Sequence, residues 1–425
     1  NTALSYDVMG INYFSSFYDQ RVDDFRTELG LCDISENVKF TGSDSRLALD
    51  ALTAGKYFVI KDREKSRVPY GYEYAYSTDE GYQVWVNEDV LPIAFVTGNV
   101  IGRSTYEGLT MVQKQAALLQ GAVVEDSQTR SYRPVDPVQD EVIPEYAVET
   151  IGKGIAYEDG KVVVTDAGAS LKLTFEGVGD AETYVTFDNL WYEPFSHSEL
   201  KALKKGKDPS AGALTLKQKL RDLWSSPNEA ASISIKGAGV SKSFSFTMPW
   251  SARYGGKHDW VANLGYTAEP LKELTLSFGA TGTYTFDVMR VECQPVASVV
   301  SNVAALRAGA EVLDVDMGVN SLDITMEVRG DESQLAVLTI PYSNGWRASV
   351  DGKSVDILAT DTAFMSVPLE GAGQHHISLT YRTVGVVIGA PISALSLGIC
   401  LASRIRKGRT KKSEQLAASL SRQES

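Results

Sequence analysis

The sequence predicts a mainly β-structured protein with an N-terminal α/β domain, two β-sandwich-like domains and one transmembrane helix close to the C-terminus. Two observations support this prediction. Short segments in which apolar residues alternate with polar ones recur from about residue 146 to residue 381, as is typical of half-buried strands. A run of 21 uncharged residues, Thr383–Ser403, follows directly. With 425 residues, the chain is also too long for a single core.

The sequence predicts a mixed α/β extracellular domain over residues 1–135. Apolar residues at helical spacing predict a helix that stops at Gly30, and two further helices are predicted over Leu47–Thr53 and Thr110–Gln120, each followed by a glycine. Between the second and third helices, residues 56–61 (KYFVIK) and 82–87 (YQVWVN) predict two strands.

Residues 146–297 predict a β-sandwich of the jelly-roll-like type, which a proline-rich linker over Arg130–Glu145 separates from the first domain. Apolar residues alternate at Leu171, Leu173 and Phe175, for example. A lysine-rich stretch over 198–224 has helical spacing instead and predicts a helical insertion. We interpret this insertion as a solvated helix face; contact with an anionic polymer is the alternative.

Residues 299–382 predict a small immunoglobulin-like β domain next to the membrane. Alternation over Leu322–Val328 and Ile377–Tyr381 predicts two of its strands. The dipeptide Asp351-Gly352 follows an alternating segment and is typical of a type I′ hairpin turn.

The uncharged run Thr383–Ser403 predicts a transmembrane helix, since at about 1.5 Å per residue it is roughly 31 Å long. A buried core helix is the alternative. Basic residues follow the run at once, and the positive-inside pattern therefore predicts a cytoplasmic basic tail over 404–425, in contact with membrane lipid, and an extracellular location for residues 1–382. These topology residues are Arg404, Arg406, Lys407 and Arg409.

Small residues in this helix predict that it packs against other spans. Gly385 and Gly389 are four positions apart, a spacing that lets membrane helices approach closely. Export of residues 1–382 also requires a signal peptide or an earlier span, and the sequence from Asn1 to Gly30 contains neither. We therefore expect the chain to be the C-terminal part of a polytopic protein with upstream transmembrane spans.

Charge and composition argue against several classes of function. The net charge is −13, and an acidic surface is unsuited to nucleic acid, which needs patches of lysine and arginine. Three cysteines without a Cys-x-x-Cys pair indicate neither a disulfide scaffold nor a zinc site. His375 and His376 on one strand would point to opposite faces, so we predict no metal site.

Aromatic residues gather in two short segments of the predicted sandwich. Flat aromatic faces can stack on sugar rings, and acidic neighbours such as Glu193 or Asp259 can accept hydrogen bonds from hydroxyl groups. Packing in the core is the alternative, because large aromatic residues are usually buried. The candidates for carbohydrate contact are Trp191, Tyr192, Trp250, Tyr254 and Trp260.

The most specific motif of the sequence is residues 340–353, IPYSNGWRASVDGK, followed by the strand around His376-Ile377 and by the final span with Pro391. This arrangement resembles the C-terminal end of the YfhO family of bacterial membrane proteins. Gly55-Lys56-Tyr57 near the N-terminus and Asn263-Leu264-Gly265 in the middle also match, so the resemblance covers essentially the whole chain. The pair His375-His376 departs from the family pattern of a single histidine.

The resemblance implies a protein of the bacterial cell membrane that is related to GT-C glycosyltransferases. Its implied role is to glycosylate cell-wall or lipoteichoic polymers with a sugar from a polyprenyl-phosphate-linked donor. It implies that the catalytic carboxylate lies in an early external loop, so we assign no catalytic residue and no cofactor to this chain. The alternatives are a non-catalytic carbohydrate- or wall-binding ectodomain on a single membrane anchor, and a scaffold that recruits partner proteins.

Overall fold

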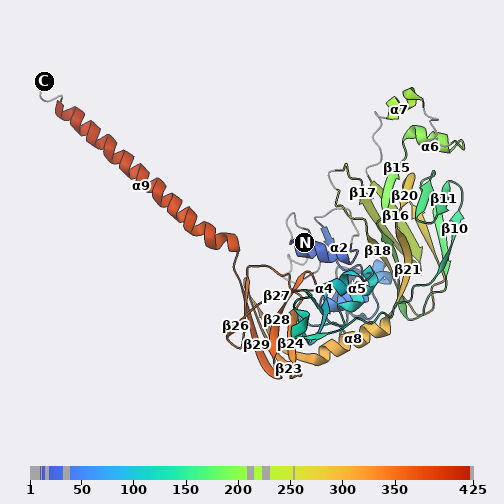
Figure 1. Ribbon diagram of the computed structural model, residues 1–425, viewed down its shortest axis with the longest axis horizontal. Coiled ribbons are helices and arrows are strands. Elements are labelled where there is room, and N and C mark those ends of the chain that lie inside the picture. The colour runs from blue at the N-terminus through green and yellow to red at the C-terminus, as the bar shows by residue number, and fades with distance from the viewer. Residues whose placement is uncertain are drawn as a thin grey trace.

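The computed structural model describes residues 10, 12–14, 19–31, 39–207, 215–222, 230–251 and 254–421. The protein is mainly β, with several sheets and one long apolar helix at its C-terminal end, and this confirms the predicted fold class. A large β-sandwich and a smaller β block lie at the two ends of the body, helices α2, α4 and α5 lie between them, and helix α9 projects away (Figure 1).

The N-terminal region contains the three predicted helices and both predicted strands. Its first helix begins after the capping residue Asp19, ends at Glu28, and is followed by Gly30 at φ 62°. The helices are α2 (Gln20–Glu28), α3 (Leu47–Leu52), η1 (Asp62–Arg67), α4 (Arg103–Glu107), α5 (Met111–Ala117) and η2 (Thr129–Ser131). The strands are β1 (Asn12–Phe14), β2 (Lys39–Thr41), β3 (Tyr57–Lys61), β4 (Glu73–Ser77), β5 (Tyr82–Val86), β6 (Ala94–Thr97), β7 (Asn99–Gly102), β8 (Ala122–Val124) and β9 (Arg133–Pro134).

The predicted linker is not without structure. Strand β9 lies inside it and pairs in parallel with β7, and Val142 forms an isolated bridge with Cys293 in the sandwich. The linker therefore follows the surface of both regions.

The β-sandwich encloses a core of alternating apolar residues such as Leu171, Leu173 and Phe175. Its sheets have the strand orders β10-β13-β19-β16-β17, β11-β12-β20-β15 and β18-β14-β21. The strands are β10 (Tyr146–Ile151), β11 (Ile155–Glu158), β12 (Lys161–Val164), β13 (Ser170–Phe175), β14 (Ala181–Asp188), β15 (Trp191–Pro194), β16 (Ala230–Gly237), β17 (Val240–Thr247), β18 (Trp260–Thr267), β19 (Glu273–Phe278), β20 (Gly282–Thr285) and β21 (Val288–Pro295).

Two short helices lie in the predicted insertion between β15 and β16. They are α6 (His197–Leu203), which a capping box of Ser196 and Glu199 begins, and α7 (Leu216–Asp222). Residues 208–214 and 223–224 of the insertion lie outside the described part of the chain.

The C-terminal block consists of two sheets with the orders β22-β23-β29-β25-β26 and β27-β28-β24-β6. Its hairpin turn has the predicted type I′ geometry, because Asp351 and Gly352 both have positive φ, 51° and 77°. The strands are β22 (Ala310–Met317), β23 (Ser321–Val328), β24 (Ser333–Leu338), β25 (Trp346–Val350), β26 (Lys353–Val355), β27 (Leu358–Thr360), β28 (Phe364–Glu370) and β29 (Gly373–Tyr381).

The N-terminal region and the C-terminal block share one sheet and one core. Strand β6 of the N-terminal region pairs with β24 more than 200 positions later in the chain. Helix α8 (Val296–Gly309) links the sandwich to the C-terminal block and packs its Val299, Val303 and Leu306 into the core of the N-terminal region (Figure 1). The boundaries at residues 135 and 299 remain predictions; between them the sandwich has a core of its own, whereas the N-terminal region and the C-terminal block share theirs.

Helix α9 (Val384–Ser421) contains the predicted apolar run. Within the described residues, one helix is long and apolar enough to cross a membrane, over Ile388–Lys407 with a mean hydropathy of 1.6. The candidate span begins five positions after the predicted start at residue 383. None of it is buried, so α9 is not a core helix of the described structure.

Candidate functional site

The structure divides the predicted carbohydrate-contact residues into two groups. Tyr192 and Trp260 are only 6% and 2% exposed and belong to the sandwich core, where Trp260 stacks on Phe244 at 5.0 Å between ring centroids. Their assignment as sugar contacts is therefore wrong, because a ligand cannot reach these rings. Trp191 and Trp250 are 43% and 53% exposed, and Tyr254 is half-buried.

Trp191 lies on an exposed aromatic cluster at one edge of the sandwich. Its indole ring stacks on the His258 imidazole at 3.7 Å between centroids and 20° between planes. His258 in turn lies 2.8 Å from the Tyr254 hydroxyl through Nε2 and 3.1 Å from the Leu190 carbonyl through Nδ1. One face of the indole is thus held by the imidazole, and the ring is fixed in position.

Asn189 connects this cluster to two carboxylates. Its Oδ1 accepts from the Trp191 Nε1–H at 2.6 Å, its backbone N–H donates to Asp259 Oδ1 at 2.9 Å, and its Nδ2 donates to Asp287 Oδ2 at 3.0 Å. Trp191, Tyr254, His258, Asn189, Asp259 and Asp287 form what we name the Trp191 edge. An aromatic ring beside hydrogen-bond acceptors is the arrangement expected of a carbohydrate-contact surface.

The sequence analysis did not identify a cavity of about 400 Å³ between the N-terminal region and the C-terminal block. Helix α2, the first turn of α4, strand β8 and the β27–β28 turn contribute to its wall. Arg21, Glu28, Arg103 and Thr362 are among the lining residues. No short-range pattern could have revealed this cavity, because its wall comes from segments up to about 340 positions apart.

The hydroxyl group of Thr362 stands at the centre of a hydrogen-bond network in this cavity. Its Oγ1 accepts from Arg103 Nη1 at 2.6 Å and donates to Glu28 Oε2 at 2.6 Å. Arg103 also pairs directly with Glu28, and its Nε donates to Glu107 Oε1 at 2.9 Å. Arg21 reaches the Thr362 carbonyl through Nη1 at 3.4 Å.

The β27–β28 turn carries two successive residues in the left-handed region, Asp361 at φ 51° and Thr362 at φ 64°. A β-branched residue such as Thr362 rarely adopts this conformation. Asp361 pins the turn to β8, because its N–H donates to the Val123 carbonyl at 2.9 Å and its Oδ1 accepts from the Val123 N–H at 2.7 Å. We name the cavity, its lining residues Arg21, Glu28, Arg103 and Thr362, and the buried Asp361 behind them the turn pocket.

Burial raises the pKa of Asp361 to about 7. Its Oδ2 has no hydrogen-bond partner in the described part of the chain. The hydroxyl of Tyr106, which is likewise buried and without a partner among those residues, has its pKa raised by burial and by the nearby carboxylates of Glu28 and Asp361. The wall behind the pocket therefore holds polar groups at a substantial energetic cost.

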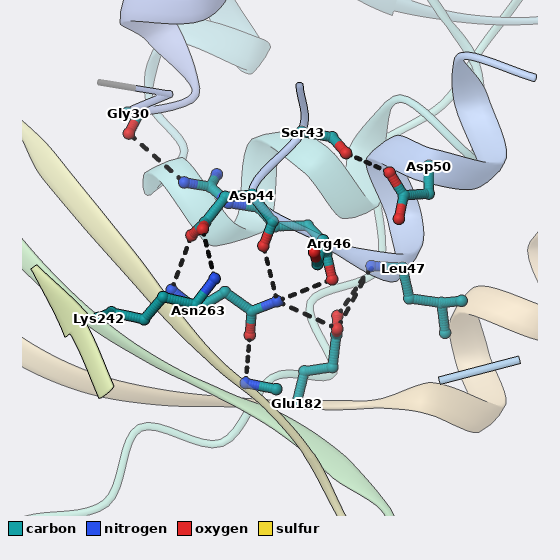
Figure 2. Close-up of polar contacts among 11 residues, drawn as sticks. Gly30, Ser43, Asp44, Arg46, Leu47, Asp50, Glu182, Lys242 and Asn263 are labelled. Atoms are coloured by element: carbon teal, nitrogen blue, oxygen red, sulfur yellow. Dashed lines mark hydrogen bonds and ion pairs between the residues drawn. The ribbon is translucent and has the colours of Figure 1, made fainter. Parts of the chain in front are cut away.

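A second polar cluster joins the N-terminal region to the sandwich (Figure 2). Glu182 on β14 accepts from the Leu47 N–H at the start of α3 and from the Tyr184 hydroxyl at 2.6 Å. Asn263 on β18 donates to the Ser45 carbonyl at 3.0 Å and to Glu182 at 3.3 Å. The cluster, named here the buried joint, consists of Ser43, Asp44, Ser45, Arg46, Asp50, Glu182, Lys242 and Asn263.

The buried joint acts as a structural connection. Arg46 is fully buried and donates to the Leu29 carbonyl at 2.5 Å, and Lys242 on β17 donates to Asp44 at 2.7 Å. Burial raises the pKa of Asp50 to about 7, although its hydrogen bond with Ser43 opposes the shift. Glu182, Lys242 and Asn263 bond to the N-terminal region across the contact between the two regions, as Figure 2 shows.

The predicted membrane residues lie along α9. Arg404, Arg406, Lys407 and Arg409 are exposed on it, and the first three fall inside the last positions of the candidate span. Side-chain atoms added at Gly385 or Gly389 would meet nothing within 4 Å in the described structure. The role of this small-residue face in helix packing remains a prediction.

The chain matches the family model described as "Bacterial membrane protein YfhO" over residues 1–393. Among curated proteins it is similar to "Uncharacterized protein YfhO" of Bacillus subtilis (strain 168), with 23% identity over 405 residues. That alignment covers 93% of this chain and 41% of the relative. The chain thus spans about two fifths of the length of this relative.

Solved structures similar to the chain include two of arabinofuranosyltransferase AftD from Mycobacteria. They are 13% and 12% identical to it, with TM-scores of 0.17 and 0.15. The matches cover 40% and 41% of this chain and 14% and 12% of the solved chains. Similarity at this level supports no conclusion about fold or function.

Proposed function

The chain belongs to the YfhO family of bacterial membrane proteins, and we propose that it is the extracellular region and final span of a membrane glycosyltransferase. In this proposal residues 1–382 lie outside the cell, α9 crosses the membrane, and the basic tail from Arg404 lies in the cytoplasm. Support comes from the basic residues that follow the apolar run, which the positive-inside pattern places on the cytoplasmic side.

The proposed reaction is the glycosylation of cell-wall or lipoteichoic polymers from a polyprenyl-phosphate-linked sugar. The proposed catalytic carboxylate lies in an early external loop between upstream spans, and the chain itself contributes contact with the acceptor polymer. Its partners are then membrane lipid, the upstream spans and the polymer.

The Trp191 edge is the observation that carries the proposed polymer contact. The indole is 43% exposed and held in place by His258, so little side-chain freedom is lost when it stacks on a sugar ring. Asp259 and Asp287 lie on either side of Asn189 and can accept hydrogen bonds from hydroxyl groups.

The test is to restore Trp191→Ala to a strain that lacks the full-length protein. The sugar content of extracted wall and lipoteichoic polymers is then measured by NMR. Loss of one stacking contact weakens polymer binding by about ten-fold, so we expect markedly lower sugar content. Tyr57→Ala is the matched control, because Tyr57 is an exposed aromatic residue on a different sheet. Normal glycosylation by the Trp191 variant would contradict the proposed contact.

A non-catalytic carbohydrate- or wall-binding ectodomain on a single membrane anchor is the second candidate. The Trp191 edge supports this candidate as well as it supports the transferase, because stacking on a sugar ring requires no catalytic group. The coding sequence upstream of Asn1 separates the two. A series of apolar spans supports the transferase, whereas a signal peptide directly upstream supports the anchored binding protein.

A further inference from the structure

The turn pocket is lined mainly by charged and polar side chains from elements that are distant in the sequence. Arg21 and Glu28 come from α2, Arg103 from α4 and Thr362 from the β27–β28 turn, around a cavity of about 400 Å³. Cavities of this size hold small ligands, and convergent polar groups give such sites their specificity. Packing alone does not account for this arrangement, since a well-packed contact leaves few voids.

The strained turn keeps a hydroxyl group inside the cavity. A non-glycine residue in the left-handed region costs about 1–3 kcal/mol, which glycine at the same position would largely avoid. Thr362 nevertheless occupies the position, and Arg103 and Glu28 orient its Oγ1 from two sides at 2.6 Å each. Asp361, through its two hydrogen bonds with Val123, holds the turn in this conformation.

The charges that line the cavity indicate what it can bind. Arg103 is already paired with Glu28 and Glu107, and Asp24 and Glu125 add two further carboxylates at the wall. Phosphate or another anion is therefore unfavourable there. A purely apolar ligand would remove water from the charged groups of the wall and offer them no hydrogen bond in return, which is costly.

A neutral polyhydroxyl ligand satisfies both kinds of group. Each hydroxyl both donates to a carboxylate and accepts from a guanidinium, so it adds no charge. The Arg21 guanidinium and the remaining lone pair of the Thr362 hydroxyl are best placed to receive it. Arg21 is exposed, and its contacts with described residues are one of 3.4 Å with the Thr362 carbonyl and one with the Tyr342 ring at 4.9 Å. Val124 and Ala359 supply apolar wall for the C–H face of a ring.

We propose that the turn pocket is a binding site for a neutral sugar unit, held by Arg21 at its mouth and by the Thr362–Glu28–Arg103 network inside. The site is separate from the Trp191 edge, and it rests on the cavity and not on the function proposed above. In this proposal, α2 and the β27–β28 turn contribute residues that contact the sugar.

The experiment measures binding of neutral monosaccharides to the full-length protein in lipid nanodiscs by saturation-transfer NMR. The probes are D-glucose, D-galactose and N-acetyl-D-glucosamine, with sn-glycerol 3-phosphate as the anionic comparison. We expect at least one sugar to bind and the anion to bind more weakly. Arg21→Ala and Thr362→Gly each remove hydrogen bonds to a ligand or its anchor, so affinity should fall about ten-fold.

Two variants serve as controls. Thr362→Ser keeps the hydroxyl and should bind as the wild type does, and Arg63→Ala changes an exposed arginine outside the pocket. If Thr362→Gly fails to fold, Arg21→Ala decides, since Arg21 is exposed on the helix surface. No sugar binding, stronger binding of the anion, or sugar binding that both pocket variants leave unchanged would each overturn the proposal. The experiment measures sugar binding and not glycosylation. A negative result would therefore overturn the pocket proposal without contradicting the proposed polymer glycosylation, which is measured separately.

Discussion

The buried joint and the turn pocket use the same local devices in two regions of the molecule. Each contains two successive non-glycine residues with positive φ, Asp44 and Ser45 at 58° and 56° in the joint and Asp361 and Thr362 in the pocket. Each also contains a buried aspartate, Asp50 or Asp361, whose pKa burial raises to about 7.

The two clusters differ in what their polar and charged side chains face. In the joint, Glu182 and Asn263 of the sandwich face the backbone at the start of α3, and their hydrogen bonds hold two regions together. In the turn pocket, Arg21 and Thr362 face a cavity. Strained backbone and a buried carboxylate therefore do not identify a binding site by themselves; an open volume beside them does.

Among single substitutions, the largest expected effect comes from removing the central carboxylate of the joint. Glu182→Ala leaves the Leu47 N–H and the Tyr184 hydroxyl without this acceptor and removes a negative charge that interacts with Arg46. We expect a loss of about 3–5 kcal/mol in the free energy of unfolding, measured by chemical denaturation. Glu182→Gln keeps an acceptor oxygen and should lose less. A loss below about 1 kcal/mol would show that the joint is not structural.

The next effect is a dependence of stability on pH that both clusters share. Because Asp50 and Asp361 bind protons more tightly in the folded protein, with pKa values of about 7 against 3.8 when exposed, stability should fall as pH rises from about 4 to about 7. Each residue contributes up to about 4 kcal/mol. The melting temperature should therefore decrease as the pH is raised across this range.

Replacing both aspartates by asparagine tests this cause. Asparagine tolerates the left-handed conformation of position 361 and keeps an acceptor for the Val123 N–H. Asp50→Asn with Asp361→Asn should flatten the pH profile, whereas Asp316→Asn, on an exposed strand, should not. An unchanged slope in the double variant would contradict the assignment.

The smallest expected effect comes from placing glycine at the strained positions 45 and 362. At position 45 the strain positions only the backbone, whereas at position 362 it also positions a side chain. Ser45→Gly relieves the left-handed residue and keeps the Ser45 carbonyl that Asn263 contacts, so stability should rise by about 0.5–1 kcal/mol. Thr362→Gly relieves similar strain but removes the hydrogen bonds to Arg103 and Glu28, so no gain is expected. Differential scanning calorimetry measures both, and destabilisation by Ser45→Gly would contradict the comparison.

The sequence by itself determined the elements whose residues repeat over a short range. Short runs that end at a glycine located α3 and α5, residues typical of strands located β3 and β5, and Asp351-Gly352 located the hairpin turn, because each signal depends on neighbours within a few positions. The apolar run located α9 in the same way. Trp191 and Tyr192 are neighbours on one strand, so their side chains must point to opposite faces of the sheet. The sequence therefore already indicates that the two residues do not share one surface.

Tertiary structure decided which of these elements share a core and which polar groups face open space. Pairing of β6 with β24 unites the first and last predicted domains, and burial removes Tyr192 and Trp260 from the candidate surface. The turn pocket joins α2 to a turn more than 300 positions later. Contacts over such separations depend on how whole sheets and helices pack, and no local pattern of residues encodes that packing.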